Sequence, residues 1–233
     1  MVAAAYLAAL AGCEPHWDAA AYGPELRWDD RIVILGQTNS GKTRHTLLML
    51  ERAQRVLVLD PAADPKWPAV GFEPWTVAEL TALDGEPLAR QRFRIVCHTA
   101  PEDWRRDDGK EREAEDTARE VRQFAALARD AEHLVEVFDE VGDYGACAGP
   151  TLKRVAKRDR HAGICALFLA QRAADIPLGV RAQSTDVISF VQSHPTDLHA
   201  LEEWCGPDFA EAAKAWRRPA PPAHWQLSTR RKS

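Results

Sequence analysis

Eight consecutive residues carry the chemistry that this sequence shows most clearly. Residues 36–43 match the P-loop pattern G-x-x-x-x-G-K-[ST]. The glycines let successive backbone N–H groups point inward at an anion. Lys42 is expected to reach the β- and γ-phosphates of a nucleotide, and the hydroxyl of Thr43 to ligate Mg²⁺. The candidate nucleotide-binding residues are therefore Gly36, Gln37, Thr38, Asn39, Ser40, Gly41, Lys42 and Thr43.

A second group of candidate residues stands at the ends of two apolar runs. Residues 133–140 (HLVEVFDE) end in Asp139, expected to hold the Mg²⁺ shell in the Walker B role, and Glu140, expected to polarise the attacking water as general base. Glu136 interrupts this run, and an apolar strand ending in acids is a weak signal alone. Residues 164–171 (ICALFLAQ) end in Gln171, which is placed to sense the γ-phosphate or to orient water. Together with the P-loop pattern, these residues indicate nucleotide hydrolysis.

Strand-like and helix-like segments alternate around these residues. A short β-rich run, 31–35, precedes the P-loop pattern, and a helix is expected over 43–52. Apolar runs without polar alternation are typical of strands buried on both faces of a parallel sheet. Further strands are expected at 55–60, 93–98, 133–140, 164–171 and 187–192, and further helices at 76–83, 113–129, 150–160 and 195–206, followed by a last helix before Pro219. The pattern predicts an α/β fold with a RecA-like P-loop NTPase core, in which helices flank a mainly parallel central sheet.

Two segments read as irregular, and the two ends read as appendages. Residues 61–74 are rich in proline, and residues 142–149 (GDYGACAG) are too glycine-rich for a regular element. The domain organisation is predicted as an N-terminal helix and strap (1–30), an ATPase domain (31–218), and a C-terminal edge strand with a basic tail (219–233). The strap is expected to close over the adenine, to dock on a neighbouring subunit, or to cover the sheet edge.

Composition limits the range of functions. The net charge of −5 and the pI of about 5.9 give no global basic surface, so nucleic-acid binding must be local or come from a ring of copies. Five cysteines without C-x-x-C spacing fit reduced thiols in a cytosolic protein. No stretch reads as a transmembrane segment.

Two basic segments have a functional and a neutral interpretation each. Residues 104–112 combine a tryptophan with alternating charges and fit either a DNA-facing loop or a solvated connection. Residues 150–160 place five basic side chains on one helix. They fit contact with a DNA backbone, a cation presented to a neighbour's γ-phosphate, or a solvated helix face.

The region 152–206 resembles the FtsK/HerA superfamily of DNA-pumping ATPases. There, an R-x-x-G-I element leads into an apolar strand ending in A-x-Q-R, followed by a short helix and another strand. The matching segments here are 160–164 (RHAGI), 169–172 (LAQR), 175–177 (DIP), 180–184 (VRAQS) and 195–198 (PTDL). In size and compactness, the sequence looks most like the genome-packaging ATPases of tailless, internal-membrane double-jelly-roll viruses. The resemblance covers about residues 31–206.

The resemblance implies a set of roles and partners. ATP and Mg²⁺ would be the cofactors, Lys42 and Glu140 catalytic groups, and Gln171 the polar sensor. Arg160 would be the arginine that completes a neighbour's site, with Arg158, Arg172 and Arg181 as the other candidates. Such ATPases form homo-oligomeric rings, here a pentamer or hexamer, around double-stranded DNA. Capsid vertex proteins are further expected partners, and the expected location is the host cytoplasm or the virion.

Three other functions share parts of this pattern. A P-loop small-molecule kinase needs a lid and an acceptor pocket, but Glu140 and Gln171 argue against it. An assembly ATPase of the filamentous-phage type shares the core but normally carries a membrane segment. A nucleotide-gated adaptor requires Glu140 to be inert.

Overall fold

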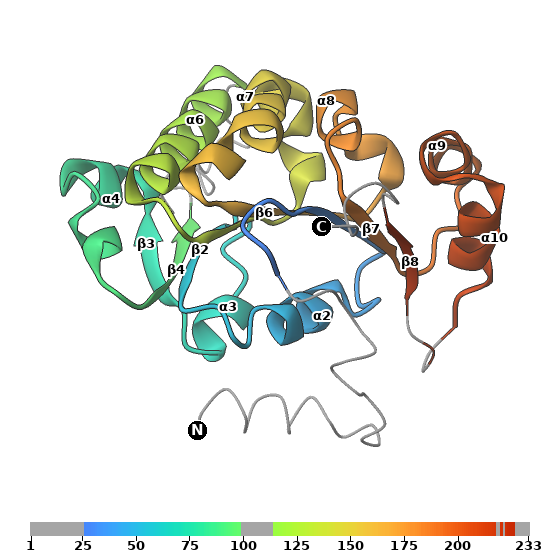
Figure 1. Cartoon of the computed structure of the whole chain (residues 1–233), viewed down its shortest axis with the longest axis horizontal. Coiled ribbons are helices and arrows are strands. Elements are labelled where there is room, and N and C mark those ends of the chain that lie inside the picture. Colours follow the sequence, from blue (N-terminus) through green and yellow to red (C-terminus); the bar gives the residue numbers. More distant parts are fainter. Residues whose placement is uncertain (1–25, 99–113, 218–219, 221, 227–233) are drawn as a thin grey trace, which may run out of the picture.

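The central sheet has eight strands and helices on both faces (Figure 1). This computed structural model describes residues 26–98, 114–217, 220 and 222–226. The strand order is β3-β4-β2-β5-β6-β1-β7-β8, parallel throughout except that β8 runs antiparallel to β7 at the edge. The predicted α/β fold with a mainly parallel sheet is therefore confirmed.

The strands are short and their order differs from their sequence order. They are β1 (Arg31–Leu35), β2 (Arg55–Leu59), β3 (Glu73–Thr76), β4 (Phe93–His98), β5 (Val135–Phe138), β6 (Cys165–Ala170), β7 (Asp186–Ser189) and β8 (Ala223–Gln226). Strand β6 lies between β1 and β5, although it follows both of them in the chain. The ends of the strands that precede the P-loop pattern and Asp139 are therefore separated by one further strand.

Helices cover both faces of the sheet. Figure 1 shows α4, α6, α7 and α8 on one face, α2 and α3 on the other, and α9 with α10 beside the β8 edge. Their bounds are α2 (Lys42–Met49), α3 (Lys66–Ala69), α4 (Val77–Ala82), α6 (Ala114–Ala131), α7 (Gly145–Arg158), α8 (Leu178–Arg181), α9 (Pro195–Cys205) and α10 (Pro207–Ala215). Among the described residues, no helix is both long and apolar enough to cross a bilayer.

Two apolar cores lie on opposite faces of the sheet because successive strand residues point to opposite sides. In β1, Val33 and Leu35 join the core under α6 and α7, whereas Ile32 and Ile34 join the core over α2 and α3. All four side chains are fully buried. This double burial explains why the central strands read as unbroken apolar runs.

Glu136 interrupts the apolar run of β5 and is nevertheless completely buried. Its pKa is raised well above the ordinary value, first by burial and then by Asp159, while Arg31 and Arg129 oppose the shift. Arg31 is also buried, and its guanidinium donates to the carbonyls of Ala156 and Ile164. A buried polar cluster thus ties β1 and β5 to the end of α7.

The two segments predicted to be irregular contain regular structure, so these predictions were wrong. Residues 61–74 include the short helix α3 and the start of the edge strand β3. Residues 142–149 form a 3₁₀ turn (Val141–Asp143) and then the first turn of α7. The glycines there serve close packing: a Cβ on Gly142 or Gly145 would lie 2.9 or 3.0 Å from atoms of Asp175.

Only part of the predicted end segments lies within the described residues. Residues 1–25, with most of the predicted helix and strap, and the basic tail lie outside the described residues, as does the loop 104–112. The predicted edge strand near 225 is β8, which pairs with β7 in the same sheet as the core. The boundaries at 30 and 218 stay a prediction.

Candidate functional site

The loop between β1 and α2 has the backbone geometry that its glycines permit. Gly41 has a φ of 114°, and Asn39 has a φ of 62°, a left-handed conformation that asparagine tolerates better than most residues. At Gly36 the constraint is space, because a Cβ would lie 2.4 Å from Ser40 Oγ and 2.8 Å from Phe190 Cβ. The spacing of the pattern therefore reflects one compact loop.

Lys42 lies inside this loop. It is 6 % exposed, and its ammonium donates to the carbonyl of Gly36 at 2.7 Å. Burial lowers its pKa, and Glu140 and Asp139 oppose that shift. Thr43 follows it in the first turn of α2 and is half-buried. The lysine and threonine of the pattern are thus both placed at the start of the helix.

Gln171 lies between the P-loop and Glu140. It follows β6, and its amide nitrogen is 3.3 Å from Glu140 Oε2, while its amide oxygen accepts from Thr38 Oγ1 at 3.3 Å. Buried Gln192, after β7, donates to the backbone oxygen of Gln171 at 3.0 Å. Residues from β1, β5 and β6 therefore meet at the carboxyl edge of the sheet.

Glu140 has a strained backbone and a shifted pKa. Its φ of 48° is left-handed, which is uncommon for a glutamate and concentrates at functional sites. Burial raises its pKa, Lys42 opposes this, Asp139 adds to it, and the hydrogen bond from Gln171 lowers it. A carboxylate with a raised pKa is a stronger base than one with an ordinary pKa.

Asp139 is fully buried and fixed by several neighbours. Its Oδ2 accepts from Trp67 Nε1 at 3.0 Å and lies 3.3 Å from Lys66 Nζ. Its Oδ1 accepts from the backbone N–H of Glu140 at 3.0 Å. Its backbone oxygen accepts from the hydroxyl of buried Tyr144 at 3.0 Å, which joins the end of β5 to the start of α7.

Sequence reasoning missed Asp60, Lys66 and Trp67. Asp60 follows β2, which pairs directly with β5, and its carboxylate accepts from the N–H groups of Ala62 and Asp64. Burial raises the pKa of Asp60 to about 7, with a further contribution from Asp139. The sequence does carry a signal for Asp60, because residues 55–60 are an apolar run that ends in an acid, as residues 133–140 are.

The pKa of Lys66 shows the acidic character of this corner. Burial alone would lower that pKa, but Asp139, Asp64 and Asp60 together raise it. Lys66 Nζ also lies 3.1 Å from Asp64 Oδ2. The site therefore combines buried carboxylates with two lysines, Lys42 and Lys66.

The carboxylates and the hydroxyl of Thr43 fit a hard divalent cation. Mg²⁺ is usually held by one or two carboxylates together with substrate phosphates and waters. In the described part of the chain, no three His, Cys, Asp or Glu side chains form a metal site of their own. Thr43 and Asp139 stay the predicted protein ligands of Mg²⁺, and the nucleotide phosphates would supply other ligands.

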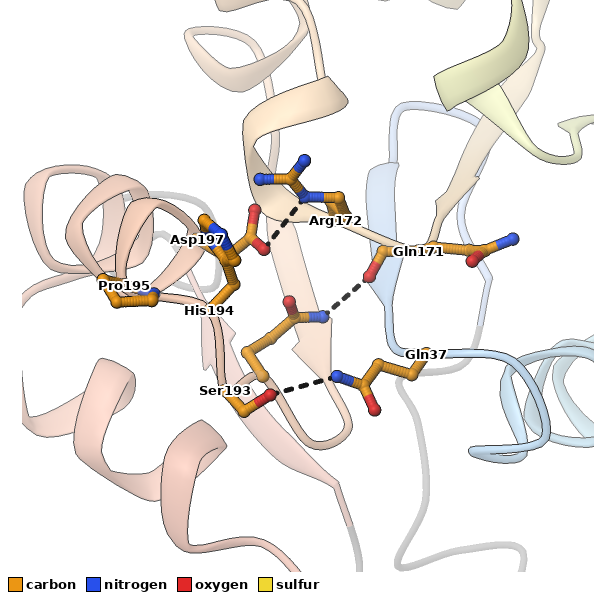
Figure 2. A pocket seen from close by; sticks show the side chains of 8 residues that line it. Gln37, Gln171, Arg172, Ser193, His194, Pro195 and Asp197 are labelled. Carbon is orange, nitrogen blue, oxygen red and sulfur yellow. Dashed lines mark hydrogen bonds and ion pairs between the residues drawn. The ribbon is translucent and has the colours of Figure 1, made fainter.

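A pocket of about 480 Å³ opens beside the P-loop, between the ends of β6 and β7 (Figure 2). Gln37 Nε2 donates to Ser193 Oγ at 3.1 Å across this pocket. Arg172 Nε pairs with buried Asp197 Oδ2 at 3.2 Å. Most of the residues that line the pocket have polar side chains, and the lining extends from the P-loop to the start of α9.

The four candidate arginines lie in different environments. Arg181 is engaged within its own chain, where its guanidinium donates to the carbonyls of Ala173, Ala174 and Ile176. Arg172 lies at the carboxyl edge and is paired with Asp197. Arg158 and Arg160 lie before β6, at the amino edge. The six residues of β6 span about 20 Å and lie between Arg160 and Gln171. The guanidinium of Arg160 is therefore too far away to reach the P-loop of its own chain.

The fold and the loop geometry define the class as a P-loop NTPase fold. A parallel sheet carries the loop after β1, an acidic pair after β5, and a polar residue after the intervening β6. These features are those expected for a RecA-like core. The roles of the individual site residues stay predictions.

Comparison with solved structures finds other proteins that share this fold. The DNA-packaging ATPase B204 from Sulfolobus turreted icosahedral virus matches with a TM-score of 0.57 and 20% identity, over 81% of this chain and 88% of that chain. The genome packaging NTPase B204 from Sulfolobus turreted icosahedral virus 2, in complex with sulfate, matches at 0.58 and 15%, over 82% and 88%. VirB4 of Thermoanaerobacter pseudethanolicus matches at 0.61 and 11%, over 84% and 89%.

At 11–20% identity, these structures show that this chain shares their fold, and that part of the predicted resemblance is confirmed. Other structures of the second B204 protein are complexes with AMP, ATP-gammaS and AMPPCP. No protein-family model matches this sequence, and no curated protein matches it.

Proposed function

We propose that this protein is a Mg²⁺-dependent ATPase that moves double-stranded DNA into a preformed viral capsid. The observation that carries the proposal is the bridge from Thr38 through Gln171 to Glu140 at the open end of a P-loop. It places a candidate base and a candidate sensor against the loop that would hold the γ-phosphate. The fold similarity to DNA-packaging ATPases supports the choice of DNA as the moved partner.

Each site residue has a distinct task in this proposal. Lys42 neutralises the β- and γ-phosphates, and Thr43 and Asp139 hold Mg²⁺, which stabilises the charge that develops during phosphoryl transfer. Glu140 accepts a proton from the attacking water, and Gln171 orients that water and the side chain of Glu140. Glu140 is thus the base, and Gln171 keeps the nucleophile next to the γ-phosphate.

A ring of copies completes the site and binds DNA. Arg160 precedes β6 and so lies at the opposite edge of the sheet from its own P-loop, and the proposal assigns it to the site of a neighbouring subunit in a pentamer or hexamer. The exposed basic side chains of α7 (Lys153, Lys157, Arg158) provide a local positive surface on a chain of net charge −5. The proposal places the ring in the host cytoplasm or on the virion, against capsid vertex proteins.

Steady-state ATP hydrolysis with and without linear double-stranded DNA tests this function. DNA is expected to raise the rate of the wild type, and Glu140→Gln to lower it at least about 10²-fold while ATPγS still binds. Glu202→Gln, an exposed glutamate on α9, is the matched control and should behave as wild type. Transfer of phosphate to a small acceptor, without DNA-stimulated hydrolysis, would contradict the proposal and favour a kinase.

A further inference from the structure

Both carboxylate oxygens of Asp139 already have hydrogen-bond or ion-pair partners in its own chain. Trp67 and Lys66 both approach Oδ2, at 3.0 and 3.3 Å, and a backbone N–H occupies Oδ1. Asp139 is fully buried, so its negative charge needs a nearby counter-ion. Lys66 is the cation that contacts it, and its ammonium stands beside the oxygen that a metal or a metal-bound water would approach.

Lys66 has a second carboxylate that it can hold instead. Asp64 Oδ2 lies 3.1 Å from the ammonium, and the side chain of Asp64 is 39 % exposed, against 1 % for Asp139. The side chain of Lys66 is itself 20 % exposed. A lysine has a flexible four-carbon stem. A small rotation would therefore release Asp139 while Lys66 keeps its contact with Asp64.

The charges around Asp139 favour such an exchange. Asp60, Asp64, Asp139 and Glu140 supply four carboxylates, against the ammonium groups of two lysines. A divalent cation next to Asp139 would be attracted by the carboxylates and would repel the ammonium of Lys66 at short range. Lys66 and a bound divalent cation therefore compete for the same carboxylate.

We propose that Lys66 is a resident cation: it neutralises Asp139 until a divalent cation binds there, and then moves to Asp64. This makes Lys66 a positioning residue that sets the metal affinity of the site. The inference rests on the proposed function for the assignment of Asp139 to the metal. It needs a bound nucleotide but no hydrolysis.

Mn²⁺ binding to the full chain with saturating AMPPCP, followed by electron paramagnetic resonance, tests the competition. Lys66→Met is expected to bind Mn²⁺ at least about tenfold more tightly than wild type, because the competing charge is gone. Lys66→Arg, which keeps the charge, should remain within about threefold of wild type. Lys214→Met, an exposed lysine on α10, is the control and should not change the affinity. Unchanged or weaker binding by Lys66→Met would overturn the proposal.

A measurement on the wild type guards against a variant that does not fold. Brief acetylation followed by mass spectrometry reports how accessible each lysine is. Adding saturating Mn²⁺ to the AMPPCP complex should increase modification of Lys66 and leave that of Lys214 unchanged. A Lys66 reactivity that ignores Mn²⁺ would also overturn the proposal.

Asp139→Asn separates this proposal from the proposed function. Added to Lys66→Met, it should remove the gain in Mn²⁺ affinity. If the gain persists, the metal does not bind at Asp139, and both ideas fail. If the gain behaves as expected but ATP is not hydrolysed, the Lys66 proposal stands and only the proposed function fails.

Discussion

The pH dependence of stability should change when Asp60 is replaced by asparagine. The pKa of Asp60 is about 7 in the folded protein, against an ordinary value of 3.8, because the carboxyl is buried next to Asp139. Between these pH values the native state binds a proton that the unfolded state has lost. This stabilising contribution is therefore present at low pH and disappears as the pH rises through 7.

The magnitude follows from the two pKa values. Each unit of difference is worth about 1.4 kcal/mol, and integrating between pH 5 and pH 8 gives about 2.5 kcal/mol of unfolding free energy lost by the wild type. Asp60→Asn cannot titrate, so relative to wild type it should gain about 2.5 kcal/mol over the same interval. The asparagine side chain has one acceptor oxygen in place of two, so the backbone N–H of Ala62 or of Asp64 loses its hydrogen bond. This loss costs about 1 kcal/mol of stability and does not depend on pH.

Urea unfolding in EDTA at pH 5, 6, 7 and 8 measures this difference. Titrating groups that do not interact with Asp60 act equally in both proteins and cancel in the comparison. Asp84→Asn is the control, since Asp84 is exposed and its φ of 50° suits asparagine. A free-energy difference between Asp60→Asn and wild type that is the same at pH 5 and pH 8 would refute the reasoning.

Two further variants test the site. Gln171→Ala should lower kcat about 10²-fold, because Glu140 and Thr38 lose their shared partner. The affinity for ATPγS, measured by equilibrium titration, should stay within about threefold of wild type. A loss of affinity as large as the loss of kcat would assign Gln171 to nucleotide binding. Arg160→Ala should lower ATP turnover by about 10³-fold or more without weakening nucleotide binding. Mixing it with Lys42→Ala should restore part of the turnover, since some contacts then pair an intact P-loop with an intact Arg160; no recovery would exclude a role in trans.

Local signals made the central sheet predictable. Buried strands such as β1 and β6 carry unbroken apolar runs, and the loop after β1 needs glycine for space at Gly36 and for its backbone at Gly41. Edge strand β3 gave no such signal, because two of its four residues are exposed, none is fully buried, and it contains Pro74. Proline is tolerated at a sheet edge, so its presence did not exclude a strand.

The rest of the site depends on tertiary placement. Asp60 precedes Asp139 by many residues, and only the pairing of β2 with β5 brings them together. Gly145 reads as a loop residue, but it lets α7 pack closely on the segment around Asp175. Arg160 and Arg181 look alike in sequence, whereas the structure shows that three backbone carbonyls hold Arg181.

The position of β6 also sets the width of the reaction space. Two inter-strand spacings separate the ends of β1 and β5, about 9.6 Å in all. The side chain of Gln171 spans the middle of that interval, with contacts of 3.3 Å to Thr38 on one side and to Glu140 on the other. On the proposed function, the order of the strands therefore fixes the spacing between the candidate base Glu140 and the loop that would hold the γ-phosphate. Gln171, at the end of the strand between them, is the residue that contacts both sides.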